Sequence, residues 1–169
     1  LNQWQTLDLA DLSRQIAIIQ SSFYAKVAQT SSDKSEQWNA ESLPLLRSEQ
    51  LIEEAKAIAA ELEARSIANP DGSLNWIGLS YELKAERFQL QVLNDNLYEG
   101  RCGVALFFAA LAQVSSESHF RNLALQTLQS MQQQIQTIDR ESQQRIARLN
   151  GIGGASGVGS TIYTFVKIS

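Results

Sequence analysis

The side chains best suited to chemistry in this sequence are its single cysteine, Cys102, and its single histidine, His119. A zinc site made of Cys and His takes three or four such ligands, so these two residues do not make one by themselves. Cys102 could be a thiol activated by a helix N-terminus, but a small packing residue at a helix start is the interpretation we favour. For His119, beside Phe120 at another helix start, we favour an exposed or capping residue over a titrating group.

Seven of the nine glycines fall into two clusters, each at the start of an apolar helix. They are Gly100, Gly103, Gly151, Gly153, Gly154, Gly157 and Gly159. An anion held at a helix N-terminus is one interpretation. However, neither cluster has the Lys-Ser/Thr of a phosphate-binding loop, nor the strand and acidic partner of a dinucleotide site. We therefore predict structural glycines that let the backbone approach its neighbours closely, namely Gly100, Gly103, Gly154 and Gly157, and no catalytic, cofactor-binding or metal-ligating residue in this chain.

The two glycine clusters also indicate an internal repeat. Residues 100–104 align with residues 154–158, which gives a period of about 54 residues, and the apolar positions that follow also match. One amphipathic helix lies between the clusters, so the unit is a buried helix followed by an outer helix. A repeat of this length built from helix pairs predicts a solenoid or a closed ring of helical hairpins. Two units do not close a ring, so we expect a fragment of one.

Spacing of apolar residues predicts the elements. Steps of three or four mark helices, and alternation marks half-buried strands. The expected helices run from Asp8 to Val27, from Ser48 to Leu62 with the stripe Leu51, Ala55, Ile58 and Leu62, from Gly100 to Gln113, from a cap at Ser115 or Ser116 to Ile138, and from Ser160 to Ile168. Residues 139–150 are either a helix tail or a loop. Strands at Leu74–Leu79 and Arg87–Leu93 complete the prediction of an all-α fold, a partial α/α toroid, with a small β-hairpin near residues 74–93.

Composition limits the classes of partner. Lys and Arg number 14 and Asp and Glu 18, a net charge of −4, whereas a nucleic-acid binder needs a clustered basic excess. The longest apolar run, Val104 to Ala112, is about half of the roughly 20 residues that span a bilayer. The sequence begins at Leu1 without a basic and then apolar leader, and one cysteine excludes an internal disulfide. We expect no nucleic-acid partner, no membrane span and a cytoplasmic location.

Both glycine clusters resemble known repeats. Leu97-Tyr-Glu-Gly-Arg-Cys-Gly-Val-Ala-Leu-Phe-Phe-Ala-Ala-Leu111 resembles the first glycine-rich repeat of the lanthionine synthetase C-like cyclase domain, and Gly151-Ile-Gly-Gly-Ala-Ser-Gly-Val-Gly-Ser-Thr-Ile-Tyr163 resembles the second. Trp76-Ile-Gly-Leu79 and Phe88-Gln-Leu-Gln91 are similar to the approach to that repeat in class II (LanM-type) lanthipeptide synthetases. The resemblance implies a helical junction segment and polar linker over residues 1–45. Residues 46–169 would be the N-terminal part of the cyclase domain, with repeats at 97–111 and 151–165.

That family folds as an α/α toroid, and its cyclase uses zinc, held by two Cys and one His, to activate a substrate thiolate. The thiolate adds to a dehydroalanine or dehydrobutyrine, which forms a lanthionine ring in lantibiotic biosynthesis. The zinc ligands and the acid/base residues belong to later repeats, so none carries over to Cys102 or His119. The resemblance implies that the partners are a precursor peptide, the remaining cyclase repeats and a dehydratase domain. We also expect self-association, and no cyclase activity or cofactor in this chain alone.

Two other functions stay open. The first is a catalytically inactive, stand-alone helical module that binds peptides or acts as a scaffold. The second is another helical toroid, such as a glycan-processing one, which would need paired acidic residues in its inner loops. Glu99 occupies such a position, but Gly153 stands opposite it in the second repeat. The glycan-processing alternative is therefore the weaker of the two.

Overall fold

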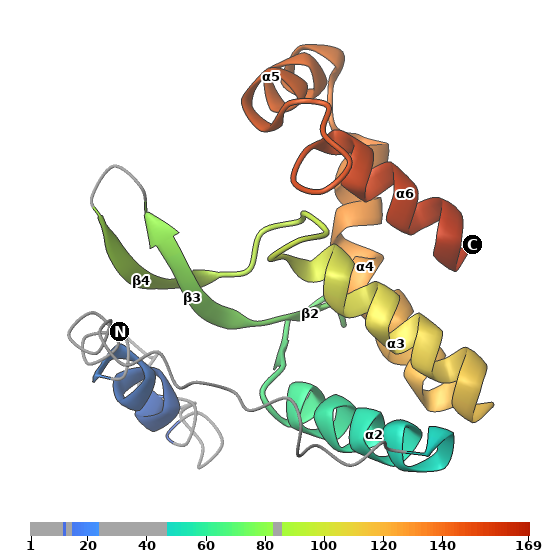
Figure 1. Ribbon diagram of the computed structural model, residues 1–169. Coiled ribbons are helices and arrows are strands. Elements are labelled where there is room, and N and C mark those ends of the chain that lie inside the picture. Colours follow the sequence, from blue (N-terminus) through green and yellow to red (C-terminus); the bar gives the residue numbers. More distant parts are fainter. Residues whose placement is uncertain (1–11, 13–14, 24–46, 83–85) are drawn as a thin grey trace, which may run out of the picture. The chain divides into compact units, whose positions relative to one another are not determined.

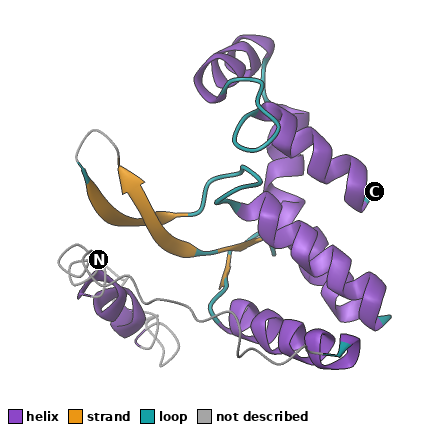
Figure 2. Ribbon diagram, viewed as in Figure 1, coloured by secondary structure: helices purple, strands orange, loops and turns teal. Residues whose placement is uncertain are grey.

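A computed structural model describes residues 12, 15–23, 47–82 and 86–169 (Figures 1 and 2). The chain divides into two compact units, one made of Leu1–Leu43 and Ile77–Val92 and the other of Pro44–Trp76 and Leu93–Ser169. Helices dominate the described residues, and the strands are few and short. The predicted all-α fold with a small β-hairpin is confirmed. None of the described helices is both long enough and apolar enough to cross a membrane.

In the first unit, residues 15–23 form a helix, in agreement with the sequence prediction. The spacing of its apolar residues predicts one buried face, which is wrong for the described residues. The exposed apolar residues are Leu12, Ile16, Ile19 and Phe23. Periodicity identifies the apolar face of a helix but not whether anything covers it. The rest of the predicted helix over residues 8–27 and the polar stretch of residues 29–36 lie outside the described residues.

The predicted hairpin is present as strands β3 (Ile77–Glu82) and β4 (Arg87–Val92), which pair antiparallel from Ile77 opposite Val92 to Glu82 opposite Arg87. The first strand was predicted to begin at Leu74, which is wrong. Residues 74 and 75 instead form a separate strand in the second unit. The strand pairing is interrupted at Trp76, whose backbone N–H donates to the side-chain oxygen of Asn75.

A small two-stranded sheet lies after the first helix of the second unit. Its strands, β1 (Ile67–Ala68) and β2 (Leu74–Asn75), are joined by a turn in which Gly72 has a φ of +82°. Glycine suits this left-handed conformation because it lacks a Cβ. The Asp71 carboxylate accepts hydrogen bonds from the hydroxyl and the N–H of Ser73, which lower the pKa of Asp71 below its ordinary value. The sequence Asn69-Pro70-Asp71-Gly72 is typical of such a turn.

Helix α2 (Ser48–Ala64) packs on the hydrophobic core of the second unit through alanines. Ala59 is buried, and Ala55 and Leu62 pack partly against the same core. The predicted stripe is wrong at Leu51 and Ile58, which are both exposed. The buried face is therefore rotated from the one that the larger side chains predict, since small residues at a helix contact allow the closer approach.

Helices α3 (Arg101–Ser115) and α4 (Ser118–Thr137) form the main helix pair of the fold. The cap predicted at Ser115 or Ser116 is wrong: Ser116 ends α3 in a left-handed conformation, and Glu117 is the N-cap of α4. The first hydrophobic cluster joins this pair to α2 and β2. Its buried members are Ala59, Leu74, Trp76, Phe108, Leu111, Phe120, Leu123 and Ala124.

Within that cluster Trp76 links three elements. Its ring lies 6.4 Å from the ring of Phe108 between centroids, and its indole N–H donates to the carbonyl oxygen of Leu62 at 2.7 Å. The N–H of Leu93 donates to the carbonyl of Trp76 at 2.9 Å, which fixes the return of the chain from the hairpin. A buried indole needs such a partner for its N–H.

The last two helices are α5 (Arg140–Asn150) and α6 (Val158–Ile168). Residues 139–150, which the sequence left as a helix tail or a loop, form a separate helix capped by the Asp139 side chain, with no fully buried residue. Helix α6 packs on α3, and a second hydrophobic cluster joins these helices to α4. Its buried members are Cys102, Ala105, Leu128, Met131 and Ile168.

Candidate functional site: two glycine loops and a cavity

The glycine loops precede α3 and α6 and close in the same way. The N–H of Arg101, the first residue of α3, donates to the carbonyl of Asn94 at 2.8 Å. The N–H of Val158, the first residue of α6, donates to the carbonyl of Gly151 at 2.9 Å. Gly100 and Gly157 are the two N-caps, and both have extended backbones. The helix starts are thus 57 positions apart, three more than the period given by aligning the glycines.

Close contacts explain three of the four glycines predicted to be structural. A Cβ at Gly100 would lie 2.3 Å from the Asn94 side chain, and one at Gly103 would lie 2.5 Å from the carbonyl oxygen of Leu97. A Cβ at Gly157 would lie 2.4 Å from the nitrogen of Gly153. Real Cβ atoms do not approach backbone atoms so closely. At Gly154 an added Cβ would meet nothing within 4 Å, so the alignment of Gly154 with Gly100 does not carry over to their packing.

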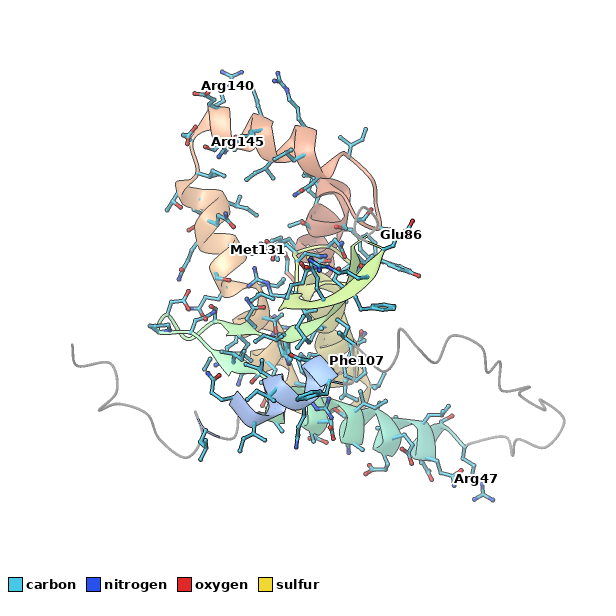
Figure 3. All side chains as sticks on the ribbon, turned by 90° about the vertical axis from the view of Figure 1, so that its left-hand side faces the viewer. Arg47, Glu86, Phe107, Met131, Arg140 and Arg145 are labelled. Atoms are coloured by element: carbon cyan, nitrogen blue, oxygen red, sulfur yellow. The ribbon has the colours of Figure 1, made fainter. Side chains whose placement is uncertain are left out.

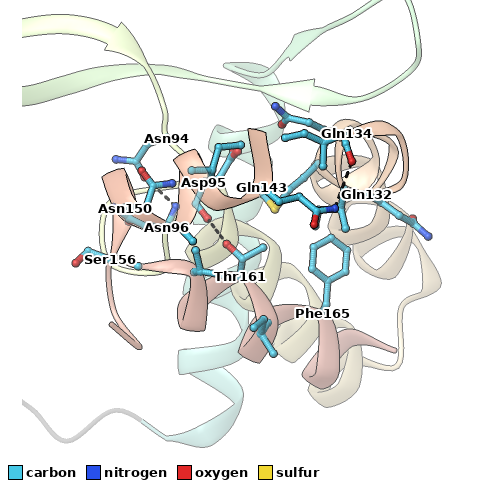
Figure 4. Close-up of a pocket in the computed structure, with 18 of the residues that line it drawn as sticks. Asn94, Asp95, Asn96, Gln132, Gln134, Gln143, Asn150, Ser156, Thr161 and Phe165 are labelled. Carbon is cyan, nitrogen blue, oxygen red and sulfur yellow. Dashed lines mark hydrogen bonds between the residues drawn. The ribbon is translucent and has the colours of Figure 1, made fainter. Parts of the chain in front are cut away.

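The two loops also contact each other. The N–H groups of Leu97 and Tyr98 both donate to the carbonyl of Ala155, at 3.0 and 3.1 Å. The hydroxyl of Thr161 on α6 donates to the carbonyl of Asp95 at 3.5 Å (Figure 4). Loop contacts therefore hold the starts of α3 and α6 side by side.

A buried arginine fixes the first loop. The guanidinium of Arg101 donates through Nε to Asp95 Oδ1 at 2.8 Å, and its terminal nitrogen pairs with the same oxygen. Its other terminal nitrogen donates to Ser130 Oγ on α4 at 2.8 Å. The Arg101 side chain is only 9% exposed. Each nitrogen of this buried charge has a partner, so we interpret the cluster as structural.

Cys102 is fully buried in the second hydrophobic cluster. Burial raises the pKa of its thiol above the ordinary value, because a thiolate is poorly solvated there; hydrogen bonds with Thr164 and Thr161 oppose this only in part. A buried thiol with a raised pKa is a poor nucleophile and a poor metal ligand. The packing interpretation of Cys102 agrees with this environment.

His119 is exposed on α4 and lies with Nε2 2.9 Å from Glu63 Oε2 on α2. A second surface ion pair, Lys56 with Glu117 at 3.0 Å, joins α2 to the N-cap of α4. His119 thus connects two helices at the surface. Among the described residues no group of three His, Cys, Asp or Glu side chains is placed to hold a metal ion. The zinc ion that the family resemblance implies does not fit these residues.

A cavity of about 1020 Å³ lies between α4, α5 and α6 (Figure 4). The end of α4, the inner face of α5, the start of α6 and the loop at residues 94–96 all contribute to it. Its lining combines apolar side chains with a series of Asn and Gln amides. Arg140 and Arg145 are exposed on α5 (Figure 3) and do not line it.

One segment of the chain contains the glycine loops, the Arg101 cluster, Cys102 and the cavity. Residues 91–167 match the family model of lanthionine synthetase C-like protein. This supports a lanthionine synthetase C-like domain over the two glycine loops, α3, α4, α5 and nearly all of α6, the segment in which the sequence motifs resemble that family. The chain matches no curated protein.

Sequence reasoning missed two features of this segment. The Arg101–Asp95–Ser130 cluster was not predicted, because a charged residue after a glycine normally indicates solvent. The cavity was not predicted either, because Gln132, Gln134 and Gln136, which line it, are exposed like residues of a solvated helix face. The strong amphipathic pattern of residues 140–150 is the sequence feature that could have indicated the cavity, since a helix with one apolar face needs something to cover that face.

Proposed function

We propose that this chain forms part of the wall of a cyclase domain in a class II lanthipeptide synthetase. The parent enzyme would form thioether rings in a dehydrated precursor peptide, using a zinc ion held by residues of later repeats. The observation that supports this most strongly is the family match over residues 91–167, which spans both glycine loops and the helices that they start. Residues 1–45 would be the junction to a dehydratase half.

The packing of this segment supports the proposal. Helix α6 packs back on α3 after α4 and α5. We assign α3 and α6 as inner helices and α4 as an outer helix of an α/α toroid, with α5 as an additional helix between α4 and α6. One face of α6 is uncovered in the described part of the chain: Ile162 is 59% exposed and Val166 is 71% exposed. A further helical hairpin of the same ring would cover such a face.

In this role the chain supplies no reacting group. Cys102 is buried with a raised pKa, and His119 is paired with Glu63 at the surface. Its contribution is positional: the paired glycine loops and the Arg101 cluster fix where α3 and α6 begin. Neighbouring repeats are then placed with respect to these helices.

The proposal is tested by assembly. The later, zinc-binding part of a class II cyclase domain is produced as a separate chain and mixed with this one. We expect a one-to-one complex in size-exclusion chromatography with light scattering. Val166→Asp, on the uncovered face of α6, should abolish it, whereas Val114→Asp, at an exposed site on α3 (60% against 71% for Val166), is the control. Failure to associate, or equal loss in both variants, would refute the proposal.

The second candidate function is a catalytically inactive, stand-alone module that binds peptides or acts as a scaffold. The cavity between α4, α5 and α6 is the observation in its favour. It would be preferred if the chain bound peptide as a stable monomer and did not assemble with the later cyclase part.

A further inference from the structure

We propose that the N-terminal helix of residues 15–23 packs, through its exposed apolar stripe, on the apolar face of the hairpin formed by β3 and β4. The stripe consists of Ile16, Ile19 and Phe23. In the proposed function this contact would make the junction before the cyclase a folded module instead of a loose tether, and that role alone rests on the proposed function. The contact itself depends only on the two elements.

The hairpin has one apolar and one polar face. Successive side chains of a strand point to opposite faces of a sheet, and the register of β3 and β4 places residues of one face opposite each other. The residues on the apolar face include Ile77, Leu79, Phe88, Leu90 and Val92. Those on the polar face include Gly78, Ser80, Arg87, Gln89 and Gln91. Leu79 is 47% exposed and Val92 is 55% exposed, so the apolar face has room for a covering element.

A two-stranded hairpin needs such a covering element. An isolated hairpin is marginally stable in water, and packing against a helix is one way to stabilise it. The contacts of the chain group residues 77–92 with residues 1–43 in one compact unit. Among the described residues of that unit, the helix is formed by residues 15–23. The division into units therefore identifies this helix as the occupant of the apolar face.

The N-terminal helix needs a partner for the same reason. Helices shorter than about 12–15 residues are marginal in water, and in proteins most of their stability comes from packing of the apolar face. Ile16, Ile19 and Phe23 follow one another at steps of three and four, so they share a face, and all three are exposed. Each of the two elements thus presents the apolar surface that the other requires.

The dimensions and the composition of the helix agree with this contact. Nine helical residues extend about 14 Å, and a six-residue strand extends about 20 Å, so the helix fits within the length of the hairpin. Residues 15–23 carry no charged side chain. A helix that lies on a lipid surface is typically rich in Lys and Arg on its polar face, whereas the polar positions here are Gln15, Gln20, Ser21 and Ser22. The composition therefore favours a protein face over a membrane.

Hydrogen–deuterium exchange of the full 169-residue chain tests the inference. The variants are Ile19→Asp on the helix and Leu79→Asp on the hairpin. We expect Ile19→Asp to raise the exchange rates of the amides of residues 77–92 about tenfold, and Leu79→Asp to raise those of residues 15–23 about tenfold, because loss of the contact opens both elements. The effect is reciprocal between two segments that are distant in the sequence, which a purely local destabilisation does not produce.

Matched controls separate the contact from a general loss of stability. Ile58→Asp changes a residue of α2 whose exposure, 55%, equals that of Ile19. Ser80→Asp changes the polar face of β3 beside Leu79. Ile58→Asp should leave exchange unchanged in both segments, and Ser80→Asp should leave that of residues 15–23 unchanged. Circular dichroism checks that each variant keeps its helices.

Disulfide trapping gives a second measurement that does not require a destabilised variant. Under mild oxidation the double variant Ile19→Cys with Leu79→Cys should form a disulfide within one chain. Ile19→Cys with Ser80→Cys, on the opposite face of β3, should not. Peptide mapping by mass spectrometry locates the bond. The native Cys102 is buried and stays in place.

Exchange changes confined to the segment that carries the substitution would overturn the inference, and so would equal cross-linking by the Leu79 and Ser80 pairs. A disulfide between two chains would mean that a second copy covers the hairpin. Protection of the two segments that arises only with phosphatidylcholine vesicles would mean that lipid covers them. Either outcome would also overturn it. Because assembly with the later cyclase part concerns α6, failure of that assembly and failure of this contact are distinguishable.

Discussion

Replacing single glycines by alanine tests which glycines of the two loops are required by close backbone contacts and which are alike only in sequence. At Gly157 an added Cβ would lie 2.4 Å from the nitrogen of Gly153 and 2.6 Å from the carbonyl oxygen of Gly151. These are backbone atoms, so the loop itself must shift. Such overpacking typically costs about 1–3 kcal/mol. At Gly154 nothing lies within 4 Å, and its φ is not positive.

We therefore expect Gly157→Ala to lower the free energy of unfolding by about 1–3 kcal/mol. For a domain of this size that corresponds to a fall in Tm of about 2–4 °C per kcal/mol. Gly154→Ala should be neutral or stabilising by less than about 1 kcal/mol, because alanine restricts the unfolded chain. Gly103→Ala should behave like Gly157→Ala, since its Cβ would lie 2.5 Å from the Leu97 carbonyl oxygen.

Urea and thermal unfolding followed by circular dichroism measure these differences. The result that refutes the reasoning is a Gly154→Ala variant as destabilised as Gly157→Ala. In that case the alignment of Gly154 with Gly100 would describe the loops better than the contacts do.

Three further predictions concern buried groups. Asp95→Ala leaves the Arg101 guanidinium buried with only Ser130 as a partner, and should lower the free energy of unfolding in urea by about 1–3 kcal/mol. Lys56→Ala removes only a surface ion pair and should lower it by less than about 1 kcal/mol. Burial raises the pKa of the Cys102 thiol, so as the pH rises this thiol ionises in the unfolded chain before it does in the folded one. The stability that the buried thiol contributes is therefore present below about pH 8.5 and is lost as the pH rises above that value. The wild-type urea midpoint should thus fall more steeply between about pH 8.5 and 10 than that of Cys102→Ala, and parallel curves would contradict the burial argument. Trp76→Phe keeps the aromatic packing but leaves the Leu62 carbonyl without its indole donor, which should lower the free energy of unfolding by about 1–3 kcal/mol. An unchanged Tm would show that water replaces the donor.

Helix positions followed from the sequence because strong periodicity depends on local geometry alone. The extents of α3 and α6, and the alternation in β4, were predicted within a few residues. Burial was less predictable. On α2 the larger side chains Leu51 and Ile58 indicated the wrong face, because the contact with the core is made by Ala55 and Ala59.

The site depended on contacts that the sequence does not encode locally. The backbone hydrogen bonds that set the start of each helix, from Arg101 to Asn94 and from Val158 to Gly151, are independent of side-chain identity. The glycine pattern therefore gave a period three residues too short. The cavity required the direction of α5 relative to α4 and α6, which a short loop at Ile138–Asp139 determines and which periodicity does not report.

The central claim, that this chain is a wall of a lanthionine synthetase C-like cyclase, is tested most directly by reconstituted activity. The rate of thioether formation in a dehydrated precursor peptide is measured by mass spectrometry after alkylation of the remaining thiols. The account predicts a rate above that of the peptide alone only when this chain and the later, zinc-binding cyclase part are mixed, and loss of that rate with Val166→Asp but not with Val114→Asp. A rate increase given by this chain alone, or a mixture no faster than the later part by itself, would contradict it.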